Sequence, residues 1–279
     1  MLNRSFIAKV LAISVASWIG VEAISQSEAS KSAITILAAS EVKWQQLNPL
    51  RGDKSPKAAT LWGHRTGPGP AGFLLKPVDG FSSPPHIHNV AYRGVVIRGL
   101  LHNDDPKAEH MWMPTGSFWT QPAGGIHITA AKGNDILAYV EVEDGFGVLP
   151  AKEAFDSKER PVNVDVTNIV WQDATTVAWL HDAGTAKLAF LWGTPAKDSL
   201  NGTLLKLPAK FSGKIRSQGQ SLRAVVIQGR LKHQSVGGNI LPPGSTFASE
   251  GKTVHSVSCA GGVECLIYIR AKGMFDVSS

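Results

Sequence analysis

Charged side chains, cysteines and long apolar runs are all scarce in this 279-residue sequence. Charged residues make up only 18% of the chain, which argues against a disordered protein or a solvated coiled coil. No run of lysine and arginine is interleaved with aromatic residues, so we expect no nucleic-acid partner. There is also no Ser-His-Asp signature, no phosphate loop and no Rossmann fingerprint.

Only two cysteines occur, Cys259 and Cys265, and they flank five residues that are typical of a hairpin turn. If Ala260 pairs with Glu264, the two thiols lie opposite each other and can form a disulfide in an oxidising compartment. A register shift of one residue would leave two free thiols instead. Both alternatives stay open, but the spacing excludes a CxxC metal or redox motif.

Apolar residues are concentrated at the N-terminus in a pattern typical of a signal peptide. Arg4 and Lys9 precede Val10–Val21, a mostly apolar stretch that is too short to span a membrane. Small residues at 21 and 23 predict a signal peptide over 1–23, with cleavage as late as residue 29 as a second option. We therefore expect a periplasmic or secreted protein with no transmembrane span in the mature chain. The alternative is a buried N-terminal strand or helix.

An internal repeat organises the rest of the chain. Leu61-Trp62-Gly63 recurs 130 positions later as Leu191-Trp192-Gly193, and residues 95–99 match 225–229 at the same offset. The offset then changes to 128, and the two-residue difference falls near residues 103–106, which resemble a loop tip. The repeat predicts an N-terminal domain over 36–150, a linker over 151–164 and a C-terminal domain over 165–279. Short β-branched runs bounded by Gly, Asn and Asp predict an all-β sandwich or small barrel in each copy.

Histidines provide the candidate chemistry. His86 and His88 are two residues apart, so on a strand both imidazoles share one face. Taken alone, such a pair is more often solvated than bound to metal. Five further histidines are isolated, and we expect them to face solvent: His64, His102, His110, His181 and His233.

The wider context of this pair resembles the cupin superfamily. The first cupin motif is Gly-x5-His-x-His, followed by a glutamate and a closing glycine; the second is Gly-x5-Pro-x-Gly-x2-His. Tyr92 stands where the glutamate of the first motif is usual. The other motif positions match, and they are Gly80, His86, His88, Gly99, Gly116, Pro122, Gly124 and His127.

The resemblance covers essentially the whole mature chain, as a bicupin. More narrowly, the sequence is similar to domain-of-unknown-function family 4437, which is related to the cupin of ChrR-type zinc-binding anti-sigma factors. Residues 51–56 and 81–105 carry that narrower likeness. It implies two tandem cupin barrels, each a double-stranded β-helix or jelly roll, and a homodimer is one option because cupins often pair through barrel faces.

Three imidazoles from His86, His88 and His127 suit a borderline divalent ion, and we expect Zn, Fe or Mn. Three protein ligands leave coordination positions open for water, a substrate or dioxygen. Tyr92 could hydrogen-bond a metal-bound water or ligate weakly; the alternative is that it packs in the barrel wall. Phe118 and Trp119 are weaker candidates for lining a small-molecule pocket, against plain core packing.

The second copy lacks this set. At the repeat offsets, Arg216 and Gln218 replace His86 and His88, and only His255 matches a ligand position. Arginine has no lone pair to offer a metal, so we expect a degenerate second site without metal. The first barrel is compatible with a metal-dependent oxygenase, isomerase or lyase acting on a small molecule. The alternative is a non-catalytic barrel that binds or senses a metal or ligand, since no general base stands out and the reaction stays unknown.

Overall fold

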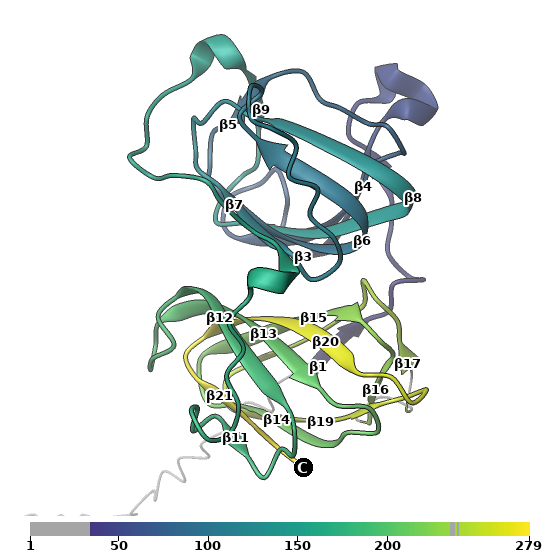
Figure 1. Ribbon diagram of the computed structural model, residues 1–279, viewed down its shortest axis with the longest axis vertical. Helices are drawn as coiled ribbons and strands as arrows, with labels where there is room; N and C mark the ends of the chain where they lie inside the picture. Colours follow the sequence, from purple (N-terminus) through teal and green to yellow (C-terminus); the bar gives the residue numbers. More distant parts are fainter. Residues whose placement is uncertain (1–33, 235–237, 239) are drawn as a thin grey trace, which may run out of the picture. The chain divides into compact units, whose positions relative to one another are not determined.

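The computed structural model describes residues 34–234, 238 and 240–279, and these form strands with only short 3-10 turns (Figure 1). The predicted signal peptide lies outside the described residues. Within them, no helix is long and apolar enough to cross a membrane. The fold is all-β and consists of two tandem cupin barrels, as the sequence predicts.

The first barrel is built on a seven-stranded sheet with the order β10-β7-β6-β8-β4-β3-β2, together with the two-stranded sheet β5-β9. The longest strands, β6 and β8, are buried over most of their length and contain continuous apolar runs. The elements are β2 (Gln45–Gln46), η1 (Pro49–Lys54), β3 (Lys57–Trp62), β4 (Ala71–Lys76), β5 (His86–His88), β6 (Tyr92–Asp104), β7 (Phe118–Gln121), β8 (Ile128–Val142), β9 (Val148–Pro150), η2 (Ala151–Glu153), β10 (Val162–Val164) and η3 (Val166–Asn168).

The second barrel consists of two six-stranded sheets, with the orders β1-β18-β15-β20-β13-β12 and β11-β21-β14-β19-β16-β17. Its strands are β1 (Ile34–Leu37), β11 (Leu180–His181), β12 (Lys187–Gly193), β13 (Leu200–Leu207), β14 (Ser212–Ser217), β15 (Ser221–Gln228), β16 (Leu231–His233), β17 (Ile240–Leu241), β18 (Thr246–Glu250), β19 (Thr253–Cys259), β20 (Cys265–Lys272) and β21 (Phe275–Ser278).

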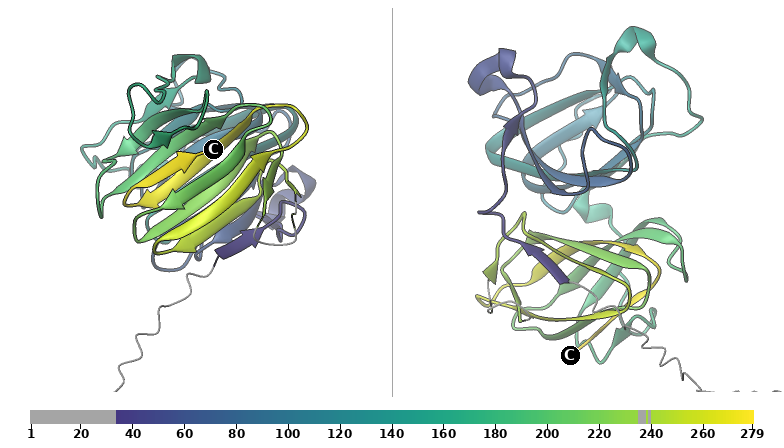
Figure 2. Two further views of the ribbon diagram at one scale, coloured as in Figure 1. Left: turned by 90° about the horizontal axis from the view of Figure 1, so that it is seen from below. Right: turned by 180° about the vertical axis from the view of Figure 1, so that it is seen from behind.

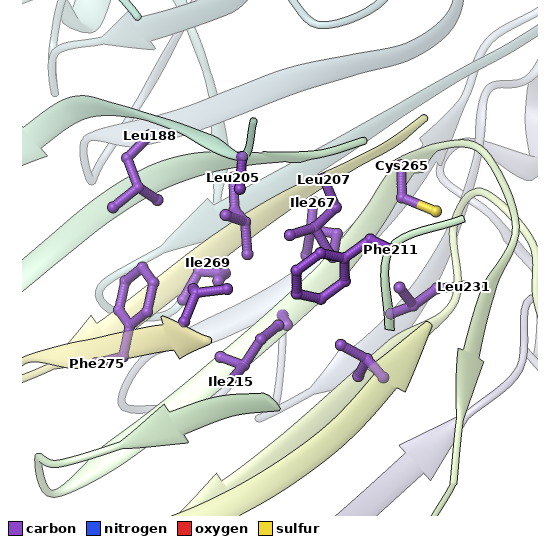
Figure 3. Packing of buried hydrophobic residues seen from close by; sticks show 14 of the residues in the cluster. Leu188, Leu205, Leu207, Phe211, Ile215, Leu231, Cys265, Ile267, Ile269 and Phe275 are labelled. Carbon is purple, nitrogen blue, oxygen red and sulfur yellow. The ribbon is translucent and has the colours of Figure 1, made fainter. Parts of the chain in front are cut away.

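Apolar side chains fill the space between the two sheets of the second barrel. Phe211, Ile215, Ile267 and Phe275 come from different strands or turns and converge there (Figure 3). Each is buried, so apolar burial in this core supplies most of the stabilisation of the barrel. The described residues of this barrel contain no three-histidine cluster.

Two short strands cross the predicted domain boundaries. Strand β1, which begins two residues before the predicted start of the first domain, pairs antiparallel with β18 of the second barrel (Figure 2). Strand β10, inside the predicted linker, pairs antiparallel with β7 of the first barrel. Segments of three or four residues carry too short a pattern to reveal their partner, because pairing is decided by the edge that is available. The domain boundaries themselves stay a prediction.

The two barrels share local details at matched positions. A β-bulge interrupts the register between Thr60 and Trp62, and another does so between Phe190 and Trp192. The Trp62 indole donates to the Tyr139 hydroxyl over 3.2 Å, and the Trp192 indole donates to the Tyr268 hydroxyl over 2.8 Å. These parallels accord with the predicted duplication, which stays a prediction.

A buried ionic cluster joins strands β8 and β20. The Glu141 carboxylate accepts from the Tyr139 hydroxyl at 3.0 Å, the Tyr268 hydroxyl at 2.9 Å and the Arg270 guanidinium at 3.1 Å. Arg270 also donates to Glu143, which in turn pairs with Arg93 at 2.7 Å. Burial, and next the charge of Glu141, raise the pKa of both phenols, so Tyr139 and Tyr268 stay protonated as donors. Every oxygen of this buried acid therefore has a donor.

Candidate metal centre

The three predicted ligands come from two backbone segments that are joined by hydrogen bonds. His86 and His88 lie on β5 with Ile87 between them, so the two imidazoles share a face and Ile87 packs into the protein on the other. His127, just before β8, exchanges both backbone bonds with His86, at 3.1 and 3.0 Å. One nitrogen from each ring lies within 4.8 Å of the others. The sequence prediction of this trio agrees with the geometry.

Backbone carbonyls fix the tautomer of all three rings. The Nδ1 atom of His86 lies 2.9 Å from the Pro84 carbonyl, that of His88 2.7 Å from Gly147, and that of His127 3.0 Å from Gly125. A carbonyl only accepts, so each Nδ1 carries the proton and each Nε2 keeps its lone pair. In metal sites, a hydrogen bond of this kind on one ring nitrogen orients the other nitrogen toward the metal. The donor set therefore fits a divalent ion of the zinc, iron or manganese type.

Burial also keeps these imidazoles neutral, which is the form that binds metal. Burial, and next the neighbouring His127, lower the pKa of His88 to about 3. Burial lowers the pKa of His127 to about 4 and lowers the pKa of His86 as well. No carboxylate touches the rings to oppose this effect. The trio is consequently ready to bind a cation at neutral pH without first losing protons.

Tyr92, the residue at the usual glutamate position, belongs to a buried polar network. Its hydroxyl donates to Asn103 Oδ1 over 2.6 Å and lies 3.3 Å from His127 Nε2. Asn103 Oδ1 also accepts from Thr129, and Asn103 Nδ2 donates to Gln121 over 3.0 Å. Burial raises the pKa of Tyr92, so it is a neutral phenol. The Tyr92 hydroxyl thus lies beside a nitrogen of the three-histidine cluster. A tyrosine that only packed in the barrel wall would not need this contact.

Sequence reasoning missed Asn103, Gln121 and Thr129. Residues 103–106 resemble a loop tip, yet Asn103 is the penultimate residue of β6 and is buried. Strand pairing is the signal that could have identified them, because Asn103 lies opposite Thr129 and Tyr92 lies opposite Gln121 on neighbouring strands. Pairing partners cannot be read before the register is known.

A cavity of about 370 Å³ opens beside the histidines. Its wall includes His86, His88, Tyr92 and Trp119, and Phe146 stacks on the His88 ring at 4.1 Å between centroids. Phe118 does not line it: this side chain points to the opposite face of β7 and packs with Val225 and Tyr268 of the second barrel. Adjacent strand residues face opposite ways, so only one of the two predicted aromatics could enter the cavity.

We expect the free energy of unfolding of the metal-free protein to fall as the pH drops from about 6.5 toward 4. In the unfolded chain His88 and His127 protonate near the usual value of 6.5, whereas their folded pKa values are about 3 and about 4. The stabilisation is complete above the unfolded pKa and is lost as the pH falls toward the folded pKa. Each group contributes about 1.4 kcal/mol per pH unit in this window.

Urea unfolding of chelator-treated protein at pH 7 and pH 5 measures this loss. A His88→Gln variant is the matched control, because it removes one of the titrating groups and should flatten the pH dependence. Equal stability of the wild-type protein at the two pH values would contradict the prediction.

The register corrects the predicted counterparts in the second barrel. His255 pairs with Ile215, as His127 pairs with His86, so Ile215 and Ser217 point inward while Arg216 and Gln218 do not. The repeat offset therefore shifts by one residue at this strand. Arg216 and Gln218 both donate to Asp276, which leaves the guanidinium ion-paired.

The surviving His255 is buried, and both of its ring nitrogens lie close to polar side chains. Its Nε2 lies 2.9 Å from the Ser249 hydroxyl and its Nδ1 lies 3.1 Å from His233 Nε2. His233 and His102 are also buried, so the expectation that they face solvent is wrong. Both lie on strands at positions that the barrel turns inward.

The two cysteines are buried and carry free thiols in this structure. A hydrogen bond between the two side chains lowers the pKa of Cys259 and raises that of Cys265. The Cys265 thiol also lies 3.5 Å from the Arg230 carbonyl. The thiols are therefore neighbours, but not across a hairpin: Cys259 on β19 pairs with Leu231, and Cys265 on β20 pairs with Leu207 in the other sheet. The disulfide stays a prediction.

Solved structures with similar folds include cupins from bacteria. One is a candidate dioxygenase from Nostoc punctiforme PCC 73102, with a TM-score of 0.64 and 14% identity over 85% of this chain and 81% of that one. AerE from Microcystis aeruginosa has a TM-score of 0.55 at 12% identity, covering 82% and 96%. The Lactobacillus farciminis oxalate decarboxylase formate complex has a TM-score of 0.56 at 11% identity, covering 88% of each chain. These likenesses show the fold.

A search of curated proteins found no match. A family model does match, and it covers residues 35–278, which is almost the whole described chain. Its description is domain of unknown function (DUF4437), the family that residues 51–56 and 81–105 resemble. With both barrels and the three-histidine site inside the matched range, the chain belongs to the DUF4437 family.

Proposed function

We propose that the first barrel binds one divalent metal ion through Nε2 of His86, His88 and His127 and uses it on a small molecule held in the adjacent cavity. The observation that carries this proposal is that three imidazoles with carbonyl-fixed tautomers each bring one nitrogen within 4.8 Å of the others. Bringing three neutral buried imidazoles together contributes little to the stability of the fold unless they bind a cation.

When bound, a three-histidine metal supplies Lewis-acid or redox chemistry at its open coordination positions. The chain's own groups then act around it. The Tyr92 hydroxyl can hold or pass a proton at the centre, and Asn103 fixes its direction. Phe146 stacks on the His88 ring, and Trp119 adds apolar surface to the same cavity, so both limit the access of water. Two structural neighbours are described as a candidate dioxygenase and an oxalate decarboxylase, which supports testing oxygenase and lyase reactions first.

A non-catalytic metal- or ligand-binding role is the second candidate, and one observation favours it. Among the described residues, no aspartate or glutamate lines the cavity, so none provides a carboxylate base there. Tyr92 lies beside the histidines, and its raised pKa makes it a poor base at neutral pH. A barrel of this kind could hold metal and ligand without turnover.

Elemental analysis of the purified native protein tests the proposal. We expect about one equivalent of a transition metal, removable by a chelator and restored by one equivalent of zinc, iron or manganese. Oxygen uptake in the presence of candidate substrates then separates the two roles, because iron or manganese with turnover supports an oxygenase and stoichiometric zinc without turnover supports binding or sensing. Native protein that binds no divalent metal contradicts the proposal and restricts the second candidate to binding a ligand without metal.

Export of the chain is a further part of the proposal, supported by the N-terminal charge and apolar pattern. Mass spectrometry of the N-terminus of protein isolated from the native cell tests it. A mature chain that begins between residues 24 and 30 supports export, whereas an intact N-terminus contradicts it.

A further inference from the structure

The cavity beside the histidines has an unusual charge balance. Apart from the histidines, its wall contains one ionisable cation, Arg51, and no aspartate or glutamate. Most of the remaining wall is apolar, including Phe73, Leu75 and Val140. A ligand that fills this space must therefore be largely apolar, and any charge on it meets a positive field.

The local sequence holds Arg51 at this wall. It lies in η1, where Asn48 Oδ1 accepts from the Leu50 backbone and the Ser55 hydroxyl accepts from the Asn48 backbone at 2.9 Å. Ser55 is fully buried and anchors the turn. Gly52, next to Arg51, has a φ of +54°, which side-chain-bearing residues rarely adopt. The turn is thus a built feature that presents Arg51.

The Arg51 guanidinium is directed to the cavity and lacks an ion pair. Its carbon lies 5.8 Å from the ring centroid of Phe81, which is itself part of the cavity wall. No carboxylate among the described residues pairs with it. Arg65 and Arg230 also lack a carboxylate partner, but they do not line the cavity. The remaining arginines in the described ranges are ion-paired: Arg93, Arg98, Arg160, Arg216, Arg223 and Arg270.

We infer that the ligand of this cavity is an amphiphilic carboxylate: an apolar body that fills the space, with an anionic group bound by Arg51. The inference rests on the proposed function, because it names the substrate class of the same site. Guanidinium is the side chain best suited to hold a carboxylate, by two parallel N–H donors. Placing the anion at Arg51 leaves the apolar body to face the histidines, where Trp119 and Phe146 surround it.

Calorimetric titration with 4-phenylbutyrate and its neutral analogue 4-phenylbutan-1-ol tests the inference on the native full-length protein. The two probes share a body and differ in charge. We expect the carboxylate to bind wild-type protein about tenfold more tightly than the alcohol. Arg51→Gln should remove that preference and leave the affinity for the alcohol unchanged. Lys54→Gln is the matched control, since it removes the same charge from the same turn at a residue that does not line the cavity.

Several outcomes overturn the inference. Equal losses in the Arg51 and Lys54 variants would show general charge attraction, and failure of both probes to bind at millimolar concentration would show that the cavity does not take this class. Carboxylate binding that depends on His127 but not on Arg51 would assign the anion to the metal, and would leave the proposed function standing. Conversely, the native protein could bind no divalent metal and still prefer the carboxylate in an Arg51-dependent way. That result would contradict the proposed function and leave the inference intact.

Discussion

Replacing any one of His86, His88 and His127 by alanine is expected to abolish stoichiometric binding of a divalent metal. Each ring contributes one Nε2 lone pair to a set whose nitrogens lie within 4.8 Å of one another, and two neutral imidazoles alone hold such an ion weakly. We expect the affinity to fall by several orders of magnitude, because a lost protein ligand is replaced only by water. Elemental analysis and a competitive chelator titration of each purified variant measure the loss.

His255→Ala is the matched control, because it removes a buried histidine from the other barrel. His255 pairs with Ile215, which offers no ligand atom, so this variant should keep its full metal content. Circular dichroism and thermal unfolding show whether each first-barrel variant is folded. Full metal content in all three first-barrel variants would refute the site assignment, and loss of metal in His255→Ala alone would move the site to the second barrel.

Arg270→Leu is expected to lower the free energy of unfolding by about 3–5 kcal/mol, the typical cost of removing one partner from a buried ion pair. The Arg270 and Glu141 side chains are only 7% and 1% exposed, and the change leaves Glu141 as a buried charge with two phenol donors. Its desolvation is then uncompensated. Urea unfolding monitored by tryptophan fluorescence measures the change in stability.

Two further variants separate the buried charge from ordinary loss of packing. In the Arg270→Leu background, Glu141→Gln should restore part of the stability, because the amide carries no charge. The Tyr139 and Tyr268 hydroxyls donate to different carboxylate oxygens, so the amide oxygen still accepts from one phenol and the amide NH2 can donate to the oxygen of the other. Arg223→Leu breaks the exposed pair with Glu250 and should cost less than about 1 kcal/mol. If Arg270→Leu and Arg223→Leu lower the free energy of unfolding equally, the buried pair of Arg270 and Glu141 does not contribute more than an exposed pair, and the prediction is wrong.

The clustering of the three histidines could be predicted from the sequence because their spacing is dictated by strand geometry. His86 and His88 obey the two-residue period of a strand, and His127 follows a glycine and proline pattern at fixed distance. Arg93 and Arg223, which match at the 130 offset, each pair with a carboxylate. These features depend on the spacing of residues along the chain, which can be read directly from the sequence.

Features that depend on register could not be predicted. The sequence offset points to Arg216 and Gln218, but a shift of one residue turns Ile215 and Ser217 to the interior instead. The support of Tyr92 by Asn103 likewise depends on which strand positions face each other. Such contacts join residues far apart in the chain, and a pattern within one segment does not specify its partner.

Strand β1 has a consequence for the order in which the chain can fold. Residues 34–37 are made early, yet their partners, residues 246–249, are made near the end of synthesis. Strand β1 therefore stays unpaired until β18 exists. Once paired, it covers the outer edge of β18, and an uncovered edge can recruit strands from other molecules. Contacts this distant in sequence also slow folding. A fragment that begins after residue 37 would lack this protection and should aggregate more readily than the full chain.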